Sequence, residues 1–324
     1  MNVLVIGGGG AIGYWSARSL EAAGHHPVLY DLGFDTAEAL GGAPMTKVQG
    51  DAADLQRLLD VAATHRIERI VHLAMIIDAE SAPIMASRVA VQGLSAALET
   101  ARARGIPRVV FASAKSAYGA TFGGHRAPTY SPATEDTPRT PVGVYGAAKL
   151  LCEEIGRAYQ ARHGVSFVAF RFASTYGLGK DTGRHGSLSL GSLMVEGAVR
   201  GEPVRLPKGG DQRQDWVYYK DIGQAVVRAC EAGDLRHQTF NIGSGIAASF
   251  AEFAACVRAE VAGADVQIGP GMNPFGTDYD AYWVLDIRRA REVLRYQPAY
   301  GTLALGIADY VREYRTRLEA SRGR

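Results

Sequence analysis

The sequence predicts an α/β fold in which a doubly wound parallel sheet is followed by a smaller C-terminal lobe. Three observations lead to this prediction. Short apolar segments alternate with helical patterns through the first half of the chain, as they do in parallel sheets. A run of glycines follows the first apolar segment directly. After about residue 175 the alternation is lost, and glycine-punctuated loops separate the remaining helices.

The N-terminal segment combines a strand, a glycine-rich turn and a helix. Residues 2–6 form a short apolar run, which is typical of a strand buried on both faces, and a helical pattern follows over 14–23. Between them, glycines without a Cβ would let backbone N–H groups approach a pyrophosphate at the helix N-terminus. The segment therefore indicates a dinucleotide site. Gly8, Gly10 and Gly13 fit the G-x-G-x-x-G spacing, and Gly7, Gly10 and Gly13 fit G-x-x-G-x-x-G equally well, so the glycines do not indicate the class of enzyme.

A second strand, expected over 26–31, ends in an acid. Asp31 is placed to accept hydrogen bonds from the hydroxyls of an adenosine ribose, and its charge would repel a 2′-phosphate. No arginine occurs in residues 32–34. The alternative is a glycine turn with no ligand, but the strand, the helix and the acid together favour binding. We therefore predict NAD as the cofactor, in preference to NADP.

Four more strands complete the expected sheet, over 46–50, 69–74, 107–112 and 165–171, with long helices over 83–104 and 145–162. The end of the third strand should face the adenine, which makes Asp51 and Ala52 candidate contacts. Asp51 could also cap the helix that follows.

The part of the chain after residue 175 has its own elements. We expect helices over about 191–200 and 221–232 and strands over 203–206 and 238–242. A further helix should begin at a capping box formed by Ser249 and Glu252, and another should run from Asp286 to Tyr296. We therefore expect an NAD-binding Rossmann domain over 1–175, which 221–242 rejoins, and a substrate-binding lobe over 176–324.

The composition excludes several classes of protein. The formal net charge is +2 and 21% of the residues are charged, which does not indicate a nucleic-acid surface. No stretch approaches the ~18 apolar residues that span a bilayer. The three cysteines lack C-x-x-C spacing and the histidines lack metal-ligand spacing. We expect a cytoplasmic protein with no nucleic-acid, membrane or metal partner.

Tyr145 and Lys149 form a Tyr-x-x-x-Lys pair. Residues four apart lie on the same face of a helix. A nearby ammonium would lower the pKa of the phenol, so that the phenolate becomes available as a general base, and the lysine could also hold the nicotinamide ribose. Such pairs also occur by chance, but this one follows the cofactor half of the sheet, which favours a catalytic role.

These motifs together resemble the extended short-chain dehydrogenases/reductases, the NAD-dependent epimerase/dehydratase family. The resemblance covers nearly the whole chain. The matching features, in family order, are the glycine turn, Asp31, Gly50-Asp51, His72-Leu73-Ala74, Ser113 through Tyr118-Gly119, Tyr145-x-x-x-Lys149, Arg171 through Tyr176-Gly177, Asp215-Trp216-Val217-Tyr218 and the helix from Asp286 to Pro298.

The resemblance implies bound NAD and hydride transfer at a sugar-like carbinol. Tyr145 would be the base, and Lys149 would hold the nicotinamide ribose. The residues that would line the cofactor come from the glycine turn, from the strand ends and from the helix that carries the pair: Gly7, Gly10, Ala11, Ile12, Gly13, Asp31, Asp51, Ala52, Leu73, Ala74, Tyr145, Lys149 and Phe172.

Departures from the family pattern lie around the expected substrate. The usual catalytic Ser or Thr is replaced by Ala114, with Ser113 and Ser116 beside it. Strand alternation would turn Ser113 to the opposite face from Ala114, which favours Ser116 as the substitute hydroxyl, with Ser113 as the alternative. Residues 114–116 contain no acid, which disfavours water elimination and decarboxylation. The usual Asn of the Asn-Val-x-Gly motif is Ala90.

Two contacts to a nucleotide sugar are also altered. The resemblance leads us to expect an Asn at Ser174 and an Arg at Gln214. Ser174 remains a candidate substrate contact, and Arg184, Arg205 or Arg213 could hold a diphosphate instead. These changes weaken the nucleotide-sugar interpretation without excluding it.

We expect an NAD-dependent oxidoreductase that oxidises a secondary alcohol of a sugar, sugar acid or polyol-like substrate. One alternative is a nucleotide-sugar epimerase, which returns the hydride to the opposite face. Another is a non-catalytic NAD-binding sensor, which the intact Tyr145 and Lys149 argue against. We also expect a homodimer, because the helices over 83–104 and 145–162 correspond to those that the family pairs into a four-helix bundle.

Overall fold

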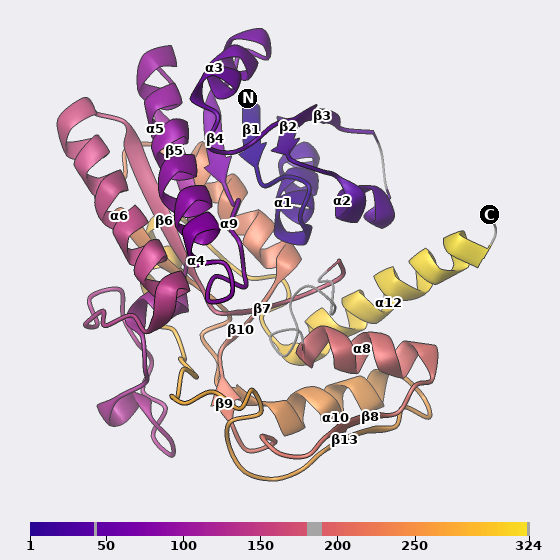
Figure 1. Ribbon diagram of the computed structural model, residues 1–324. Helices are drawn as coiled ribbons and strands as arrows, with labels where there is room; N and C mark the ends of the chain where they lie inside the picture. Colours follow the sequence, from indigo (N-terminus) through magenta and orange to yellow (C-terminus); the bar gives the residue numbers. More distant parts are fainter. Residues whose placement is uncertain (42–43, 180–189, 323–324) are drawn as a thin grey trace.

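The computed structural model describes residues 1–41, 44–179 and 190–322. Its largest element is a seven-stranded sheet in the order β11-β6-β5-β4-β1-β2-β3, with every neighbouring pair parallel (Figure 1). This sheet confirms the predicted fold class. The strands agree with the predicted ones to within two residues at each end: β1 (Asn2–Ile6), β2 (His26–Asp31), β3 (Thr46–Gln49), β4 (Arg69–His72), β5 (Arg108–Ala114), β6 (Ser166–Phe172) and β11 (Thr239–Ile242).

The order of the strands reverses beside β1. From β1 the chain moves outward through β2 and β3, and it then returns to β4 on the other side of β1 and continues through β5, β6 and β11. Ligands of doubly wound sheets bind at the carboxyl ends of the strands at this reversal. The topology therefore places the candidate site at the carboxyl ends of β1, β4 and β5.

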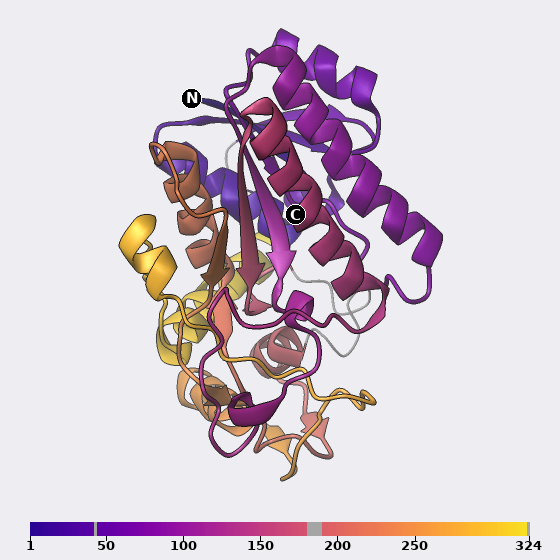
Figure 2. The ribbon, with the colours of Figure 1, turned by 90° about the vertical axis from the view of Figure 1, so that its left-hand side faces the viewer.

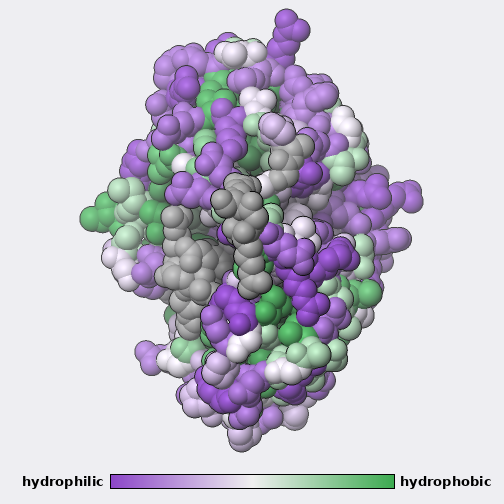
Figure 3. Space-filling view, turned by 90° about the vertical axis from the view of Figure 1, so that its right-hand side faces the viewer, coloured by the Kyte–Doolittle hydropathy of each residue, from purple (hydrophilic) through white to green (hydrophobic). Residues whose placement is uncertain are grey.

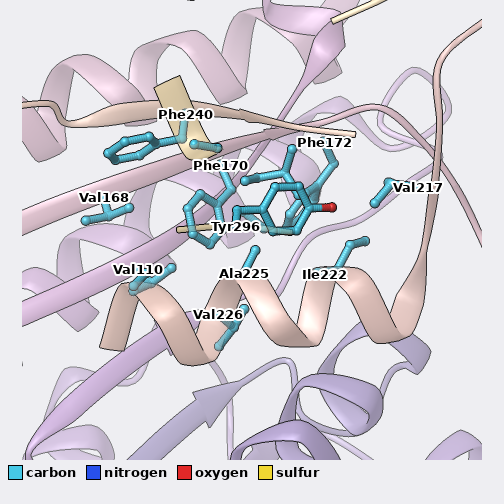
Figure 4. Close-up of a cluster of buried hydrophobic side chains, with 14 of the residues drawn as sticks. Val110, Val168, Phe170, Phe172, Val217, Ile222, Ala225, Val226, Phe240 and Tyr296 are labelled. Atoms are coloured by element: carbon cyan, nitrogen blue, oxygen red, sulfur yellow. The ribbon is translucent and has the colours of Figure 1, made fainter. Parts of the chain in front are cut away.

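The alternating residues of β1 show why both faces of the sheet are buried. Val3 and Val5 belong to one core cluster, which includes residues of α9 (Tyr219–Glu231), while Leu4 and Ile6 belong to a second cluster. α1 (Ala11–Ala22) packs against α9 on the first face. Figure 4 shows Ile222, Ala225 and Val226 of α9 beside the strand side chains of this cluster.

The second face is covered by α3 (Leu55–Thr64), α5 (Gly93–Arg104) and α6 (Gly143–His163). The single helix expected over 83–104 is divided in the structure. α4 (Pro83–Ser87) leads into a π-helical turn, η1 (Arg88–Gln92), and then into α5. A π turn inside a helix is often found at a functional site. Ala90, where the family has an asparagine, lies in this turn.

The remaining chain builds a third core. It contains α8 (Leu190–Arg200), α10 (Phe250–Glu260) and α12 (Leu303–Arg322), and every buried member of its cluster comes from residue 176 or later. The predicted capping box at Ser249 and Glu252 is present. Short strands connect the segments in pairs, β7 (Ser174–Tyr176) with β10 (Trp216–Tyr218), β9 (Arg213–Gln214) with β12 (Ala248–Ser249), and β8 (Val204–Leu206) with β13 (Val266–Ile268).

Four more short helical segments lie between these elements in the described ranges. α2 (Asp35–Leu40) follows β2, η2 (Lys115–Tyr118) follows β5, and η3 (Gly123–His125) lies in the loop before α6. α11 (Arg288–Val293) ends three residues before Tyr296, where the sequence suggested its end. Arg295 adopts a φ of 54°, which a continuing right-handed helix does not allow. Within the described ranges, no helix is both long and apolar enough to cross a membrane.

A buried carboxylate joins three separate segments near the junction of the sheet and the third core. Asp215 accepts hydrogen bonds from the backbone N–H groups of Ser244 (2.9 Å), Gly245 (3.2 Å) and Leu285 (3.3 Å). Burial raises the pKa of Asp215 to about 6 despite these donors. The side chain thus ties together the loops that follow β11 and precede α11.

Another buried carboxylate fixes α6 to the sheet. Glu153 forms a two-point ion pair with Arg171 of β6 (2.9 and 2.6 Å) and accepts a hydrogen bond from Ser113 of β5 (2.6 Å). All three side chains are buried, and the Arg171 guanidinium holds the pKa of Glu153 below its ordinary value in spite of the desolvation.

Glu153→Gln should lower the free energy of unfolding by about 3–5 kcal/mol, because it leaves the Arg171 guanidinium buried without a charge partner. Its neighbour provides a matched control. Glu154 is half exposed and pairs with Arg139 and Arg157, so Glu154→Gln should cost no more than about 1 kcal/mol. Urea unfolding of both variants measures the difference, and equal losses would contradict the structural role of Glu153.

Candidate active site

The glycine turn fits a dinucleotide by its shape. Gly7 has a φ of 86°, and a Cβ there would lie 2.5 Å from the backbone nitrogen of Ala74. A Cβ on Gly13 would lie 2.2 Å from the carbonyl oxygen of Gly7. Gly10 is exposed at the N-terminus of α1, which has no side-chain cap. The free N–H groups and the helix dipole at this end suit a pyrophosphate.

Asp31 lies at the end of β2 and holds the glycine turn. Its carboxylate accepts hydrogen bonds from the backbone N–H groups of Gly9 (2.9 Å) and Leu32 (2.8 Å), and also from Gly33. Burial nevertheless raises the pKa of Asp31. An ionised carboxylate offers about four acceptor positions. Asp31 can therefore accept a further hydrogen bond from a ribose hydroxyl while it orders the turn.

The candidate adenine contacts lie at the end of β3. Asp51 forms an ion pair with Arg88 of the π turn (2.6 Å) and accepts a hydrogen bond from the Ala53 backbone (2.9 Å). Both contacts lower the pKa of Asp51, the Ala53 donor most. The suggestion that Asp51 caps the next helix is wrong, because Asp54 caps α3 by accepting from the Arg57 N–H. A contact of Asp51 or Ala52 with adenine stays a prediction.

Three more predicted cofactor positions are brought to this edge. The backbone of Leu73 and Ala74, just after β4, passes against Gly7. Phe172 is the last residue of β6, and its side chain lies in the core cluster shown in Figure 4. Only the backbone of Phe172 is therefore available to a cofactor.

Tyr145 and Lys149 lie on the first turns of α6, whose N-terminus is held by Glu80. The carboxylate of Glu80 accepts from the N–H of Val144 at 2.6 Å. The Lys149 Nζ lies 5.5 Å from the centroid of the Tyr145 ring and donates to the Ala112 carbonyl oxygen at 2.5 Å. The pair is therefore assembled on one helix face, as the spacing predicted.

The proton affinities of the pair differ from the expectation. Burial raises the pKa of Tyr145 to about 12 and lowers that of Lys149 to about 8. The prediction that the ammonium lowers the pKa of the phenol is therefore wrong for the protein alone. Lys149 is buried and Tyr145 is partly buried, and Lys149 directs a proton to Ala112 instead of to the phenol oxygen.

The two candidate serines have different surroundings. Ser113 is buried and donates to Glu153, on the opposite face of β5 from Ala114, so it is not available to a substrate. Ser116 lies in η2, and its Oγ is buried with no hydrogen-bond partner among the described residues. The Ser116 carbonyl oxygen packs against Gly146, next to Tyr145. Ser116 stays the predicted substitute hydroxyl.

The candidate substrate contacts are only partly brought together. Ser174 lies at the carboxyl edge of the sheet, whereas Arg184 lies outside the described residues. Arg213 pairs with Glu252 (2.7 Å) and donates to Ala247. Arg213 is thus engaged within the protein, and a contact of Arg213 with a substrate stays a prediction.

Arg205 is also engaged, in an ion pair with Asp265. Lys115 has no role predicted from the sequence beyond its not being an acid. In the structure, its ammonium donates to the Ser174 Oγ at 2.6 Å and to the Gln214 Oε1 at 3.5 Å. Its place directly after Ala114, at a strand end, was the signal that could have identified it.

Comparison with known proteins agrees with this geometry. The model of the NAD dependent epimerase/dehydratase family matches residues 3–243. The chain belongs to this family. It is 31% identical to the UDP-glucose 4-epimerase of Mycolicibacterium smegmatis, over 98% of this chain and 99% of that protein.

Solved structures show the same fold. That of the UDP-glucose 4-epimerase of Thermotoga maritima, with UDP-glucose, has a TM-score of 0.82, with 24% identity over 98% of this chain and 100% of the other. That of the Thermus thermophilus enzyme, in complex with NAD, has a TM-score of 0.79, with 24% identity over 97% and 99%. Membership of the family confirms the recognised resemblance, the prediction of an enzyme and the prediction of NAD as cofactor.

The pH profile should report the Tyr145–Lys149 pair. The pair loses one proton near pH 8 and the second near pH 12, and the form with a phenolate beside an ammonium holds one proton. The value of kcat/KM for the sugar substrate should rise by up to about tenfold per pH unit until the first of these protons is lost, and should then level off.

Lys149→Met should move that rise to higher pH, because the phenol then titrates alone near 12. Initial rates between about pH 6 and pH 10 measure both profiles. A wild-type rate that falls with rising pH below about pH 8 would contradict the assignment of Tyr145 as base.

A set of three substitutions tests the hydroxyl beside Ala114. Ser116→Ala should lower kcat about 10²–10³-fold if Ser116 donates to the reacting oxygen, which is the usual effect of losing one such donor. Ala114→Ser should leave kcat unchanged or raise it. Ser113→Ala is the control. It should reduce stability but not kcat, because Ser113 donates its hydrogen bond to Glu153. Full activity of Ser116→Ala would mean that no local hydroxyl assists the reaction.

Proposed function

We propose that this protein is an NAD-dependent epimerase of a nucleotide sugar or a closely related anionic sugar. The observation that carries the proposal is the full-length similarity to a UDP-glucose 4-epimerase, which spans the glycine turn, Tyr145 and Lys149. The geometry supports it, because these three features lie along one edge of the sheet. Oxidation of a carbinol requires a base and a hydride acceptor at the same place.

The residues of the chain have separate tasks in this proposal. Tyr145 removes the proton of the substrate hydroxyl, and Lys149 holds the nicotinamide ribose and adds positive charge beside the phenol. Ser116 donates a hydrogen bond to the reacting oxygen. NAD, when bound, supplies the hydride acceptor. Epimerisation follows when the oxidised sugar rotates within the site, so that it is reduced again on its opposite face. Tyr145 then returns the proton.

Net dehydrogenation of a sugar or sugar acid is the second candidate. Ala114, Ser174 and Gln214 favour it, because each departs from the family pattern on the substrate side of the site. The two candidates share the first step and differ in the fate of the reduced cofactor. An epimerase retains it, and a dehydrogenase releases it at each turnover.

Incubation with UDP-glucose or UDP-galactose separates the candidates. The epimerase proposal expects interconversion of the two sugars, followed by NMR, with no accumulation of NADH at 340 nm. Release of NADH in step with turnover would instead show the dehydrogenase. Tyr145→Phe should lower either activity about 10²–10⁴-fold while NAD still binds.

We also propose that the NAD-binding part comprises residues 1–175 together with 221–242, and that the substrate-binding part comprises the rest of 176–324. Two observations support this division. β11 lies beside β6 in the main sheet, and α9 packs on α1. The third core, in contrast, draws its buried residues from 176 onward.

Asp31 should make the protein prefer NAD over NADP by about tenfold or more, because its carboxylate would face the added 2′-phosphate in a partly buried site. Fluorescence titration with each cofactor measures the preference. Asp31→Asn keeps an acceptor for the Gly9 N–H but removes the charge. It should therefore reduce the difference between the affinities for NAD and NADP. Equal binding of NADP by the unaltered protein would contradict the role of Asp31.

A homodimer should form through the face made by α4, η1, α5 and α6, which lie side by side (Figure 2). This face exposes Ile84 (87%), Met85 (48%) and Leu151 (50%). The opposite side of the molecule is mostly hydrophilic (Figure 3). Leu151→Glu should shift the dimer to monomer in light scattering, whereas Leu305→Glu, an equally exposed leucine on α12, should not. A monomeric unaltered protein at micromolar concentration would contradict the dimer.

A further inference from the structure

Lys115 brings together three segments that are far apart in the sequence. It is the first residue of η2 and directly follows the end of β5. Its Nζ donates to the Oγ of Ser174, in β7, and to the Oε1 of Gln214, in β9. The cluster therefore connects the carboxyl edge of the main sheet to a strand that pairs with the N-terminus of α10.

The hydrogen-bond directions within this cluster leave further donors available. The Ser174 Oγ accepts from Lys115, so the hydroxyl proton of Ser174 can be given to another group. Only the oxygen of the Gln214 amide can accept from an ammonium, so its NH₂ group points elsewhere. A hydroxyl, an amide NH₂ and an ammonium are then present at one place. Donors of this kind, with one of them charged, suit a carboxylate or a phosphate.

The place of the cluster also suits a substrate. Ligands of doubly wound sheets lie beyond the carboxyl ends of the strands, and Lys115 follows Ala114 at such an end. Lys149, on the same edge, donates to Ala112, two residues before Ala114. Two arginines of the third core are already in ion pairs, Arg213 with Glu252 and Arg205 with Asp265.

We propose that Lys115, Ser174 and Gln214 form a subsite that binds an anionic group of the substrate, either a sugar carboxylate or a phosphate. The subsite makes the enzyme select anionic carbohydrates over neutral ones. This assignment rests on the proposed function for the place of the substrate. It adds Lys115 as the residue that sets specificity, and Ser174 and Gln214 as the residues that hold its ammonium.

Binding to the NAD-loaded protein tests the subsite without any turnover. Calorimetry compares two pairs of probes, each differing by an anionic group: glucuronate with glucose, and UDP with uridine. Lys115→Met keeps the length of the side chain and removes its charge. It should weaken binding of the anionic member of one pair about 10- to 100-fold. The affinity for the neutral member of that pair should change less than about twofold. Lys115→Arg should restore most of the loss.

The probe pair that responds identifies the source of the anion, a sugar carboxylate or a diphosphate. Lys47→Met is the control, since Lys47 is an exposed lysine in an ion pair with Glu38. It should leave the binding of both probe pairs unchanged. A purely structural role of Lys115 would lower the melting temperature and weaken charged and neutral probes alike, which would overturn the proposal. A wild-type protein that binds neither anionic probe better than its neutral partner would overturn it as well.

The outcome is independent of the assay for epimerase activity. Loss of anion selectivity in Lys115→Met, together with the absence of both sugar interconversion and NADH release, would refute the proposed reaction and leave the subsite intact. Interconversion of UDP-glucose that is equally efficient in Lys115→Met, with the binding of both probe pairs also unchanged by this substitution, would refute the subsite and leave the reaction intact.

Discussion

The buried pair of Glu153 and Arg171 is the interaction on which the geometry of the site depends. Tyr145, Lys149 and Glu153 are spaced four residues apart, so they lie along one face of α6. Glu153 is tied to β6 through Arg171 and to β5 through Ser113. These contacts fix the rotation of the helix about its axis. The same rotation directs Lys149 to the end of β5 and places Tyr145 beside it.

Holding the pair in this way also buries Lys149 and part of Tyr145, and this burial gives the site its electrostatic character. Lys149 lies over the ring of Phe111 (4.9 Å) and its pKa falls to about 8, whereas that of Tyr145 rises to about 12. The phenolate is therefore scarce in the protein alone. A positive charge near the phenol favours its ionised form. The oxidised nicotinamide carries such a charge, so binding of the cofactor and activation of the base should be linked.

The sequence was sufficient for the parts of the molecule that depend on local pattern. Strands buried on both faces are continuously apolar, and a turn that cannot accommodate a Cβ requires glycine, so β1 and Gly7–Gly13 were predictable. Strand alternation correctly disfavoured Ser113. Long-range pairing was not predictable. The partners of Lys115 lie 59 and 99 residues away, and Arg213 is taken up by Glu252, 39 residues later. The pKa values of Tyr145 and Lys149 depend on burial, which only the folded chain defines.

The departures from the family pattern form a consistent set once Lys115 is included. An arginine holds a carboxylate or a phosphate with a planar fork of donors, whereas a lysine offers a point charge on a flexible stem. A subsite built on Lys115 and neutral partners therefore selects charge more than shape. An epimerase must bind its substrate and its product, which differ in the direction of one hydroxyl. Binding both through an anionic group that the reaction leaves unchanged satisfies this requirement. A lysine on a flexible stem can adjust to both sugars more easily than the rigid fork of an arginine.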